Sequence, residues 1–207
     1  KIRQPKMHEL VVNLHIHSVY SDGTATHNEI LTTASQVGID VVIVTDHNLL
    51  VQGVESYHES KQGMTLLLTG EEVHNRSSKF NHRGHLLVLN AGQEMSTYGS
   101  QPQQLIHQIS GSGGLSFIAH PFENPLPEFN EGEYSWGSWN VRGFTGLEIW
   151  NGLSEMKTVG RPRWRTLLYA VFPQLVARSP HPETLKKWDE LTTASQTVVA
   201  IGGSDAH

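Results

Sequence analysis

The stretch LHIHSVYSDG, residues 14–23, places two histidines at the end of a predicted β-strand. The strand pattern runs from Leu10 to His17 and breaks at the Asp-Gly turn that follows. An imidazole costs more free energy to bury than the valines beside it, because its ring nitrogens lose their water. His15 and His17 lie two residues apart and therefore share one face of the strand. Two imidazoles aimed at one point need a common partner.

Composition excludes several classes of protein. The 207 residues carry a net charge of −5 and no cysteine, and 37% of them are hydrophobic. No apolar run reaches the roughly 18 residues of a membrane span, and the acidic balance argues against an extended nucleic-acid interface. The absence of cysteine rules out disulfides, thiolate zinc sites and cysteine nucleophiles, and it fits a cytoplasmic protein. Thirteen histidines against fifteen Lys plus Arg suit a metal site with nitrogen and oxygen ligands.

Segments with a strand pattern alternate with helical segments along the chain. Thr26 and Glu29 form a capping box at the start of a helix that Gly38 ends. Further helices are predicted at Val51–Gln62, Pro102–Ser110, Arg163–Phe172 and Glu183–Ser195. Seven strands are predicted, at Leu10–His17, Asp40–Thr45, Met64–Thr69, 85–90, 115–120, 146–150 and 197–203.

The alternation predicts an α/β fold with a parallel sheet, because parallel strands need crossover connections. Seven such strands favour a barrel over an open sheet. The length suits one domain over residues 1–207, and no repeat or linker divides the chain. The segment 122–144 is rich in Gly, Pro, Trp and Asn and is a candidate lid.

Residues that can bind metal begin or end most of the predicted strands. The carboxyl ends of the strands face the active site in parallel α/β barrels, so these side chains are expected to converge. Hydrogen bonds alone would hardly satisfy so many histidines and carboxylates at one mouth, whereas zinc, manganese or iron would. The residues are His15, His17, Asp46, His47, Glu71, Glu72, His85, His120, Asp205 and His207.

A structural role is the alternative for each of these residues taken singly. A lone histidine at a strand end is usually capped or solvated, and Asp46 in TDH can cap a helix. Two more histidines near the mouth, His74 and His82, are candidates to support the ligands. Taken jointly, the order of the motifs favours metal binding. Surface positions are expected for the histidines away from the strand ends, which are His8, His27, His58, His107 and His181.

The motifs HIHSVYSDG, TDHN, GEE, GHLLVLN, IAHPF and GGSDAH follow one another in an order known from one family of metallohydrolases. With them the chain resembles the PHP family, the polymerase and histidinol phosphatase family, over essentially its whole length. GLEIWNG and KWDEL resemble more particularly its branch of carbaryl-hydrolase-like proteins. The resemblance implies a distorted (β/α)7 barrel, which agrees with the seven predicted strands. That fold has a closing helix after the last strand, so we expect the chain to continue beyond His207.

The resemblance implies two or three bound divalent cations, of zinc, manganese or iron, with the candidate residues divided among them. The first cation would be held by His15, His17, Glu72 and Asp205. The second would share Glu72 as a bridging carboxylate and be completed by His85 and His120. The third would be held by Asp22, His47 and His207.

The catalytic carboxylates expected from the same resemblance are Asp46, Glu72 and Asp205. Asp46 would support the ligands rather than bind metal. The pair Glu71 and Glu72 is ambiguous, but Glu72 fits the family spacing G-x-E. Glu71 should then point to the other side of its strand.

Three cations against three carboxylates leave a positive site, which suits a phosphate dianion. We therefore expect a metal-dependent phosphoesterase that hydrolyses a small phosphomonoester through a hydroxide bridging two metals. Candidates to bind the substrate oxygens are Arg83, Arg142 and Arg161, each of which also fits a solvated surface arginine.

Two other functions are compatible with the same motifs. One is ester or carbamate hydrolysis on the same fold, for which Trp136, Trp139 and Trp150 would line an apolar pocket. The other is a non-catalytic PHP module. A complete ligand set favours an enzyme, but the sequence does not name its substrate, metal or oligomeric state.

Overall fold

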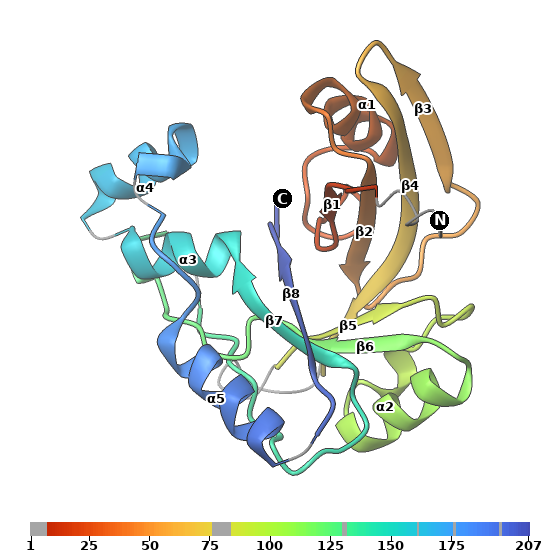
Figure 1. Ribbon diagram of the computed structural model, residues 1–207, viewed down its shortest axis with the longest axis vertical. Helices are drawn as coiled ribbons and strands as arrows, with labels where there is room; N and C mark the ends of the chain where they lie inside the picture. Colours follow the sequence, from red (N-terminus) through yellow and green to blue (C-terminus); the bar gives the residue numbers. More distant parts are fainter. Residues whose placement is uncertain (1–7, 76–83, 130–131, 161, 176, 195) are drawn as a thin grey trace, which may run out of the picture.

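The computed structural model describes residues 8–75, 84–129, 132–160, 162–175, 177–194 and 196–207 and contains one mixed sheet with helices outside it (Figure 1). The strands are β1 (Val12–Asn13), β2 (Val41–His47), β3 (Ser56–Ser60), β4 (Gly63–Val73), β5 (Leu86–Leu89), β6 (Leu115–Ile118), β7 (Gly146–Asn151) and β8 (Val199–Gly203). The helices are α1 (His27–Val37), α2 (Pro102–Gly111), α3 (Gly152–Val159), α4 (Arg163–Val171) and α5 (Pro182–Thr193). Short 3-10 turns lie at Ser96–Tyr98, Pro127–Phe129 and Pro173–Leu175.

The sheet closes almost into a barrel, as the sequence predicted. Its strand order is β1-β2-β4-β5-β6-β7-β8, with β3 paired to β4. Beyond the ends of β1 and β8 the chain pairs again, because Ile16 forms a parallel bridge with Ala206. The N–H of His17 donates to Ala206 O and that of Asp205 to His15 O, each at 2.9 Å. The seven-stranded α/β barrel is thereby confirmed, and the His-x-His segment lies in its seam.

One barrel strand runs opposite to the predicted direction. β5 is antiparallel to both β4 and β6, whereas the other neighbouring pairs in the barrel order are parallel. The expectation of a parallel sheet is therefore wrong for β5. Its start lies opposite the end of β6, with Leu86 paired to Ile118. This reversal brings His85, just before β5, to the mouth where the other strands end.

The helix predicted at Val51–Gln62 is wrong. Ser56–Ser60 is instead strand β3, which forms a hairpin with the first half of β4 through the pair Ser60 and Gly63. Val51, Val54 and Tyr57 have helical spacing, but Tyr57 is 71% exposed and belongs to no buried face. Pairing with a strand contributed by the next segment outweighed a weak local pattern.

Helix α1 begins and ends as its sequence predicts. The Oγ1 of Thr26 accepts a hydrogen bond from the Glu29 N–H, and the Glu29 carboxylate accepts one from the Thr26 N–H. Gly38 ends the helix with a φ of 79°, a conformation that glycine adopts without steric cost. In the described ranges, no helix is both long and apolar enough to cross a membrane.

Residues of the barrel strands alternate between the interior and the helix-covered outside. Leu87 and Leu89 of β5 pack inside with Phe117 and Ala119. Leu86 and Val88 face outward into the core beneath α2. This period of two places polar groups at the top of the interior, above a floor of apolar side chains.

Gly23 is required where the chain turns after Asp22. A Cβ on this residue would meet the carbonyl oxygen of His17 more closely than real Cβ atoms come. We expect Gly23→Ala to lower the free energy of unfolding by about 1–3 kcal/mol, because the backbone of the turn must shift. The measurement is urea denaturation. Gly111→Ala is the control, since its Cβ would meet open space at the end of α2 and should be neutral or stabilising by about 0.5–1 kcal/mol. Equal stability of the two variants would contradict the prediction.

Candidate metal centre

Glu72 lies at the centre of the polar cluster inside the barrel mouth. It comes from β4 beside His47 of β2, and its side chain is 1% exposed. Its carboxylate oxygens lie 2.9–3.4 Å from ring nitrogens of His15, His17, His47, His85 and His120. The structure thus brings together residues from five separate segments of the sequence.

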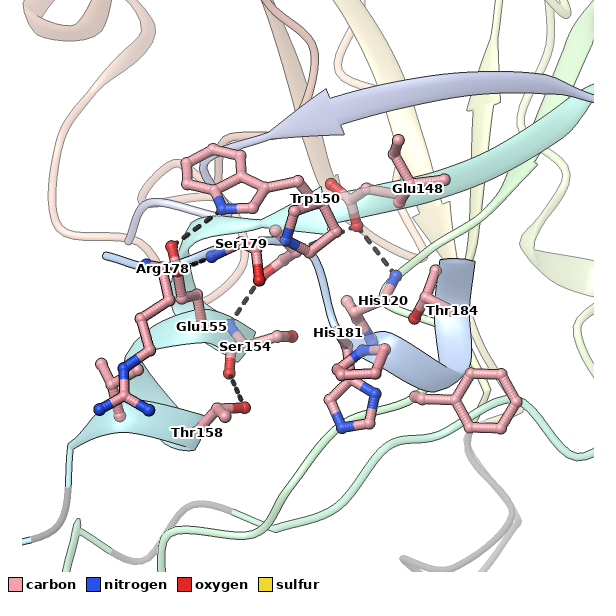
Figure 2. Close-up of a pocket in the computed structure, with 16 residues that line it drawn as sticks. His120, Glu148, Trp150, Ser154, Glu155, Thr158, Arg178, Ser179, His181 and Thr184 are labelled. Atoms are coloured by element: carbon pink, nitrogen blue, oxygen red, sulfur yellow. Dashed lines mark hydrogen bonds between the residues drawn. The ribbon is translucent and has the colours of Figure 1, made fainter. Parts of the chain in front are cut away.

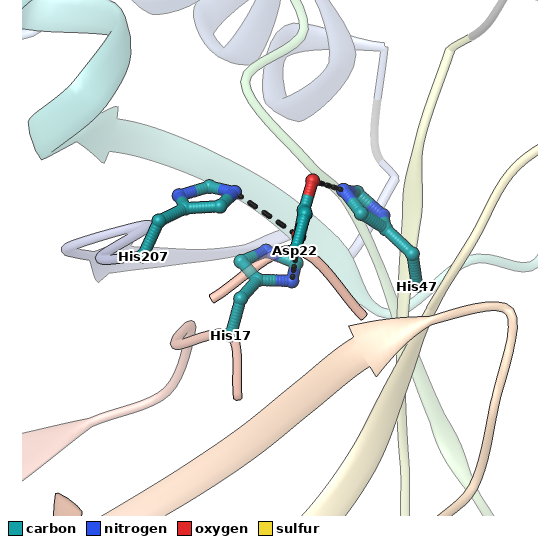
Figure 3. Close-up of side chains that lie close together, drawn as sticks. All are labelled: His17, Asp22, His47 and His207. Atoms are coloured by element: carbon teal, nitrogen blue, oxygen red, sulfur yellow. Dashed lines mark ion pairs between the residues drawn. The ribbon is translucent and has the colours of Figure 1, made fainter. Parts of the chain in front are cut away.

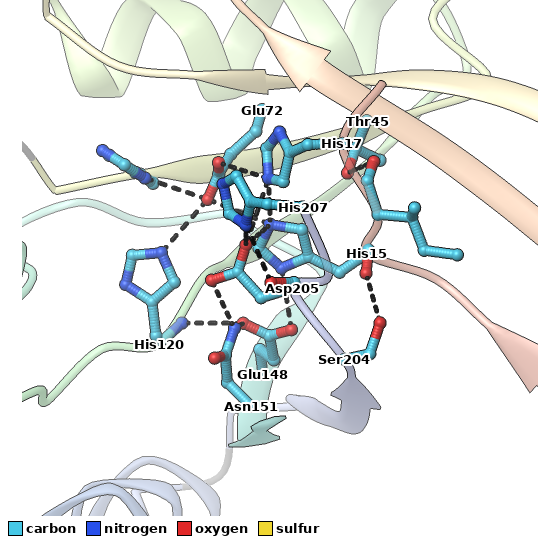
Figure 4. Close-up of polar contacts among 12 residues, drawn as sticks. His15, His17, Thr45, Glu72, His120, Glu148, Asn151, Ser204, Asp205 and His207 are labelled. Carbon is cyan, nitrogen blue, oxygen red and sulfur yellow. Dashed lines mark hydrogen bonds and ion pairs between the residues drawn. The ribbon is translucent and has the colours of Figure 1, made fainter. Parts of the chain in front are cut away.

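The first predicted ligand group has the spacing of a tetrahedral metal site (Figure 4). Nε2 of His15 lies 3.2 Å from Nε2 of His17, and the two lie 3.3 and 3.1 Å from Oδ1 of Asp205. Glu72 lies beside these three atoms, with Oε1 3.3 Å from the His15 nitrogen and Oε2 3.4 Å from the His17 nitrogen. A tetrahedron around a zinc ion with bonds near 2.0–2.1 Å has edges of about 3.3 Å. The donor atoms of His15, His17 and Asp205 therefore fit three corners of such a tetrahedron.

The second group shares Glu72 with the first. Nδ1 of His85 lies 2.9 Å and Nε2 of His120 3.1 Å from the same Oε1 of Glu72. His85 reaches this point from the start of the reversed β5, and His120 from the end of β6. The other oxygen of Glu72 faces His17 and His47, so the carboxylate is placed to bridge two cations.

The third group gathers around Asp22 at the edge of the mouth (Figure 3). Its carboxylate lies 3.4 Å from Nε2 of both His47 and His207. Nδ1 of His17 lies 3.6 Å away, so His17 faces the first group with one nitrogen and this group with the other. Asp22 is 53% exposed, which makes this the most open of the three groups.

Two of the clustered residues have a strained backbone. His120 has a φ of 26° and Asp205 a φ of 54°, in a region that residues with a Cβ rarely adopt. Such conformations cost free energy and cluster at functional sites. The strain aims both side chains at Glu72 and its neighbours, which is consistent with a site built for binding rather than for stability.

The cluster lacks hydrogen-bond partners for several buried atoms. Nδ1 of His120 is buried without one among the described residues, and Nδ1 of His47 and Oε2 of Glu72 lie 3.0 Å apart as an ion pair without hydrogen-bond geometry. Burial alone would raise the pKa of Glu72, but the charges of His85, His15 and His47 hold it well below its usual value. The same carboxylate is therefore ionised and needs cations around it. The donor set suits divalent metal ions.

Glu148 supports the ligands, and the sequence analysis gave it no role. From β7, its Oε1 accepts a hydrogen bond from Nδ1 of His15 at 2.9 Å. Its Oε2 accepts from the backbone N–H of His120 at 2.9 Å and from Asn151 Nδ2 at 3.0 Å. Asn151 also donates to Asp205 at 3.1 Å. A carboxylate that fixes the far nitrogen of a metal-binding histidine is a recurrent partner of such ligands.

Asp46 anchors the turn that carries Asp22. Its carboxylate accepts hydrogen bonds from the N–H and hydroxyl of Ser18 at 2.8 and 2.7 Å, and from the Ser21 hydroxyl at 2.7 Å. It lies 3.8 Å from His27, which is buried, so the surface position expected for that histidine is wrong. In the described contacts Asp46 meets no carboxylate or imidazole of the three groups. Its place is that of a positioning residue.

Glu71 points away from the cluster, as expected for the neighbour of Glu72 on a strand. Its Oε2 accepts a hydrogen bond from the backbone N–H of Met95 at 2.7 Å. Burial raises its pKa to about 7. The strand register confirms the alternation, since Glu72 pairs with the inward Leu87 and Glu71 with the outward Val88.

A cavity of about 490 Å³ opens above the three groups. Lys157 of α3 lines it, with Nζ 3.0 Å from Glu123 and 5.0 Å from the centre of the Tyr134 ring. Tyr134 in turn stacks on His85 at 5.3 Å. The sequence analysis missed Lys157 because it missed α3, whose signal was the N-cap Asn151 accepting from the Ser154 N–H.

Three arginines were predicted to bind the substrate. No arginine among the residues that the structure describes lines this cavity. Arg142 is exposed and donates to Val141 O at 3.2 Å, away from the residues that line the cavity. Arg83 and Arg161 lie outside the described residues, as does His82. Lys157 is the lysine that lines the cavity in the part of the chain that the structure describes.

Of the three tryptophans predicted to line an apolar substrate pocket, Trp150 lines a cavity, whereas Trp136 and Trp139 do not. Trp136 is 5% exposed and packs in the core beneath α2, with Trp139 against it. Trp150 lines a separate cavity of about 250 Å³ between β7, α3 and α5, together with Phe122 and Val159 (Figure 2). Its Nε1 donates to Glu155 at 2.9 Å. Ser154 and Glu155 of α3 face this second cavity, whereas Leu153 and Lys157 face the first, and His120 lines both.

The chain matches the PHP domain over residues 13–125, more than half of its length, and therefore belongs to the PHP family. It is 29% identical over 121 residues to the uncharacterized protein MJ1587 of Methanocaldococcus jannaschii, an overlap of 53% of this chain and 67% of that protein.

Two crystal structures share the fold. A protein of Bifidobacterium adolescentis, inferred to be a metal-dependent phosphoesterase, superposes with a TM-score of 0.58 at 15% identity, over 96% of this chain and 88% of the other. A two-domain protein of Bacteroides vulgatus, inferred to contain a PHP-like metal-dependent phosphoesterase, gives a TM-score of 0.53 at 19% identity, over 96% and 52%. The chain thus spans about half of the second protein. At these identities the likeness establishes the fold alone.

Replacement of Glu148 tests its role in holding His15 and His120. A glutamine has only one accepting atom, so Glu148→Gln cannot keep both hydrogen bonds. We expect metal affinity to fall by about 10–100-fold with the fold intact. The measurement is competition for zinc with a chromophoric chelator. Glu183→Gln, at an exposed position of α5, is the control, and equal affinity of the two variants would exclude the role.

Metal affinity should rise with pH. Burial lowers the pKa of His47, but Glu72 and Asp22 outweigh it and raise that pKa to about 10. Burial is likewise outweighed at His120, where the hydrogen bond with Glu72 and the charge of Glu123 raise the pKa to about 9. Both imidazoles are thus protonated at neutral pH without metal, and a cation must displace these protons. Calorimetric titration in buffers of different ionisation enthalpy should show proton release and tighter binding at about pH 8 than at about pH 6. Binding that is independent of pH and buffer would contradict these shifts.

Proposed function

We propose that this chain is a metal-dependent phosphoesterase that acts on a small phosphomonoester. Family membership and the fold support the broader class, a metal-dependent hydrolase. The observation that carries the proposal is the set of donor atoms around His15, His17 and Asp205, which lie 3.1–3.3 Å apart as a cation requires. The position of the cluster, in a cavity rather than in the packed core, supports a reaction on a bound molecule.

The proposed division of ligands follows the three groups. His15, His17, Glu72 and Asp205 hold one cation; Glu72, His85 and His120 a second; Asp22, His47 and His207, with one nitrogen of His17, a third. Zinc, manganese and iron all suit these donors. When bound, such ions lower the pKa of water and stabilise charge that develops on phosphate oxygens.

The protein's own residues determine where a substrate can lie. Glu72 and Asp205 hold the buried side of the cluster, and Asp22 stands at its open edge. Lys157 and Tyr134 form the opposite wall, and Glu123 holds both, since it accepts the Tyr134 N–H at 3.1 Å. With cations bound at the cluster, a phosphoryl group placed between these walls would meet their charge on one side and the Lys157 ammonium, which is paired with Glu123, on the other. That arrangement favours an anion over a neutral ester.

Carbamate or carboxyl-ester hydrolysis is the second candidate, and only the resemblance of GLEIWNG and KWDEL to the carbaryl-hydrolase-like branch favours it. Trp188 of KWDEL stabilises the fold, because its Nε1 donates a hydrogen bond to Val198 O at 3.0 Å. Trp136 lies in the core, away from a substrate. A non-catalytic PHP module remains the third hypothesis for the function. A location in the cytoplasm remains a hypothesis from the composition.

A substrate panel with one variant separates these functions. Metal-loaded protein is compared on p-nitrophenyl phosphate, a nucleoside monophosphate, p-nitrophenyl acetate and an aryl carbamate. We expect the highest kcat/KM for the phosphomonoesters. Asp22→Ala should lower that value on the order of 100-fold, because it removes the carboxylate of the third group while leaving the other two intact. Asp189→Ala on α5 is the matched control.

The outcomes are distinct. Preference for the neutral substrates, unchanged by Asp22→Ala, would overturn the phosphoesterase and favour the carbamate reaction. Metal uptake without turnover of any substrate would support a binding module. Failure to bind zinc, manganese or iron at all would overturn the proposal entirely.

A further inference from the structure

Helix α4 and the turn after it carry an exposed apolar face. Large apolar side chains that are 48–70% exposed make up this α4 face, namely Trp164, Leu167, Val171, Phe172 and Leu175. Trp164, Leu167 and Val171 are spaced three and four residues apart, so they form one stripe along the helix. Single exposed apolar residues are common on protein surfaces, but a contiguous group of this kind marks a surface that binds something.

The fold leaves the α4 face open. The opposite side of α4 packs on α3, where Tyr169 and Leu168 contact Val159 and Met156. In Figure 1, α4 lies beyond α3 and projects away from the barrel sheet. In the part of the chain that the structure describes, no hydrophobic cluster includes a residue of the α4 face.

Positive charge flanks the stripe on both sides. Arg163 and Arg165 adjoin Trp164 in sequence and therefore lie about 100° to either side of it around the helix. The guanidinium of Arg165 lies 6.0 Å from the centre of the Trp164 ring. Arg163 donates to the backbone carbonyl of Glu128 at 3.3 Å and lies 6.0 Å from the Phe129 ring. Neither of these contacts is with a carboxylate.

The charge of the surrounding segment is opposite to that of the whole chain. Residues 156–182 contain no Asp or Glu, whereas the chain carries a net charge of −5. An anionic surface would attract this segment and repel the rest of the molecule, so it would orient the protein with α4 toward the surface. The cationic residues of the segment are Lys157, Arg161, Arg163, Arg165 and Arg178.

An apolar stripe between arginines matches the interface of a phospholipid membrane. There the apolar side chains reach the boundary of the acyl chains, arginines meet the phosphates, and tryptophan lies at the level of the headgroups. A second copy of this chain fits less well, because a symmetric contact through the α4 face would bring the same arginines of both copies together.

We propose that the α4 face docks on the surface of a membrane that contains anionic phospholipids. The side chains of the face would enter the headgroup region while the barrel stays outside the membrane. The proposal goes beyond the hydrolase function and uses none of the metal-binding residues. It can therefore fail while the proposed function holds.

The test is co-sedimentation of the protein with lipid vesicles. We expect binding to vesicles of equal parts phosphatidylglycerol and phosphatidylcholine, weakened by salt, and none to phosphatidylcholine alone. Leu167→Gln should weaken binding about tenfold or more, because it removes an apolar side chain from the contact. Val37→Gln on α1 is the matched control, since Val37 and Leu167 are both 68% exposed, and it should bind as wild type does.

Two further variants test the charge and the position of the tryptophan. Arg163→Gln should weaken binding about fivefold, whereas Lys186→Gln, which removes an exposed cation from α5, should not. Mixed vesicles should shift the tryptophan emission to shorter wavelength, and Trp164→Phe should remove most of that shift.

No binding to the mixed vesicles would overturn the proposal, and so would equal losses in Leu167→Gln and Val37→Gln. Equal binding to both kinds of vesicle would exclude the recognition of anionic lipid. A dimer in sedimentation equilibrium that Leu167→Gln dissociates, without vesicle binding, would assign the α4 face to a second copy instead. Each of these results leaves the metal-dependent turnover of phosphomonoesters to be judged by its own experiment.

Discussion

One buried carboxylate organises this protein. Glu72 is 1% exposed and contacts five imidazoles from four other segments, so its charge is compensated only if those segments are all in place. An isolated buried charge costs far more than the barrel could tolerate. The closure of the seam, the reversal of β5 and the strained backbone of His120 all bring imidazoles to this residue.

The same cluster shows how binding competes with stability. Without a cation, the imidazoles differ in pKa. Nearby carboxylates raise the pKa of His47 and His120, whereas burial lowers the pKa of His17 and His85. Several buried donor atoms make no hydrogen bond to the residues that the structure describes. Divalent ions would relieve both problems at once, since one cation satisfies several donors and releases the extra protons. A structural role alone would have been served better by apolar residues.

Much of the fold follows from local sequence. The capping box of Thr26 and Glu29, the stop at Gly38 and the buried DVVIVT strand depend on neighbours in the chain, and each forms as predicted. The sequence alone also shows that histidines and carboxylates lie at strand ends. Because the strand ends of a barrel meet at one mouth, their convergence could be predicted. The two faces of Glu71 and Glu72 follow from the period of a strand.

Tertiary structure alone decided the rest. The direction of β5 and the pairing of Ser56–Ser60 depend on distant strands, whose hydrogen bonds no local pattern encodes. Glu148 is recognisable as a support only once β7 lies beside His15, 133 residues away in sequence. Lys157 comes from a helix whose start rests on one Asn151 cap and whose inward side is set by packing on β7. The sequence by itself determined which residues can bind metal, because residue chemistry and strand period are local. Their convergence and their supporting partners depend on long-range contacts, and only the folded barrel decides those.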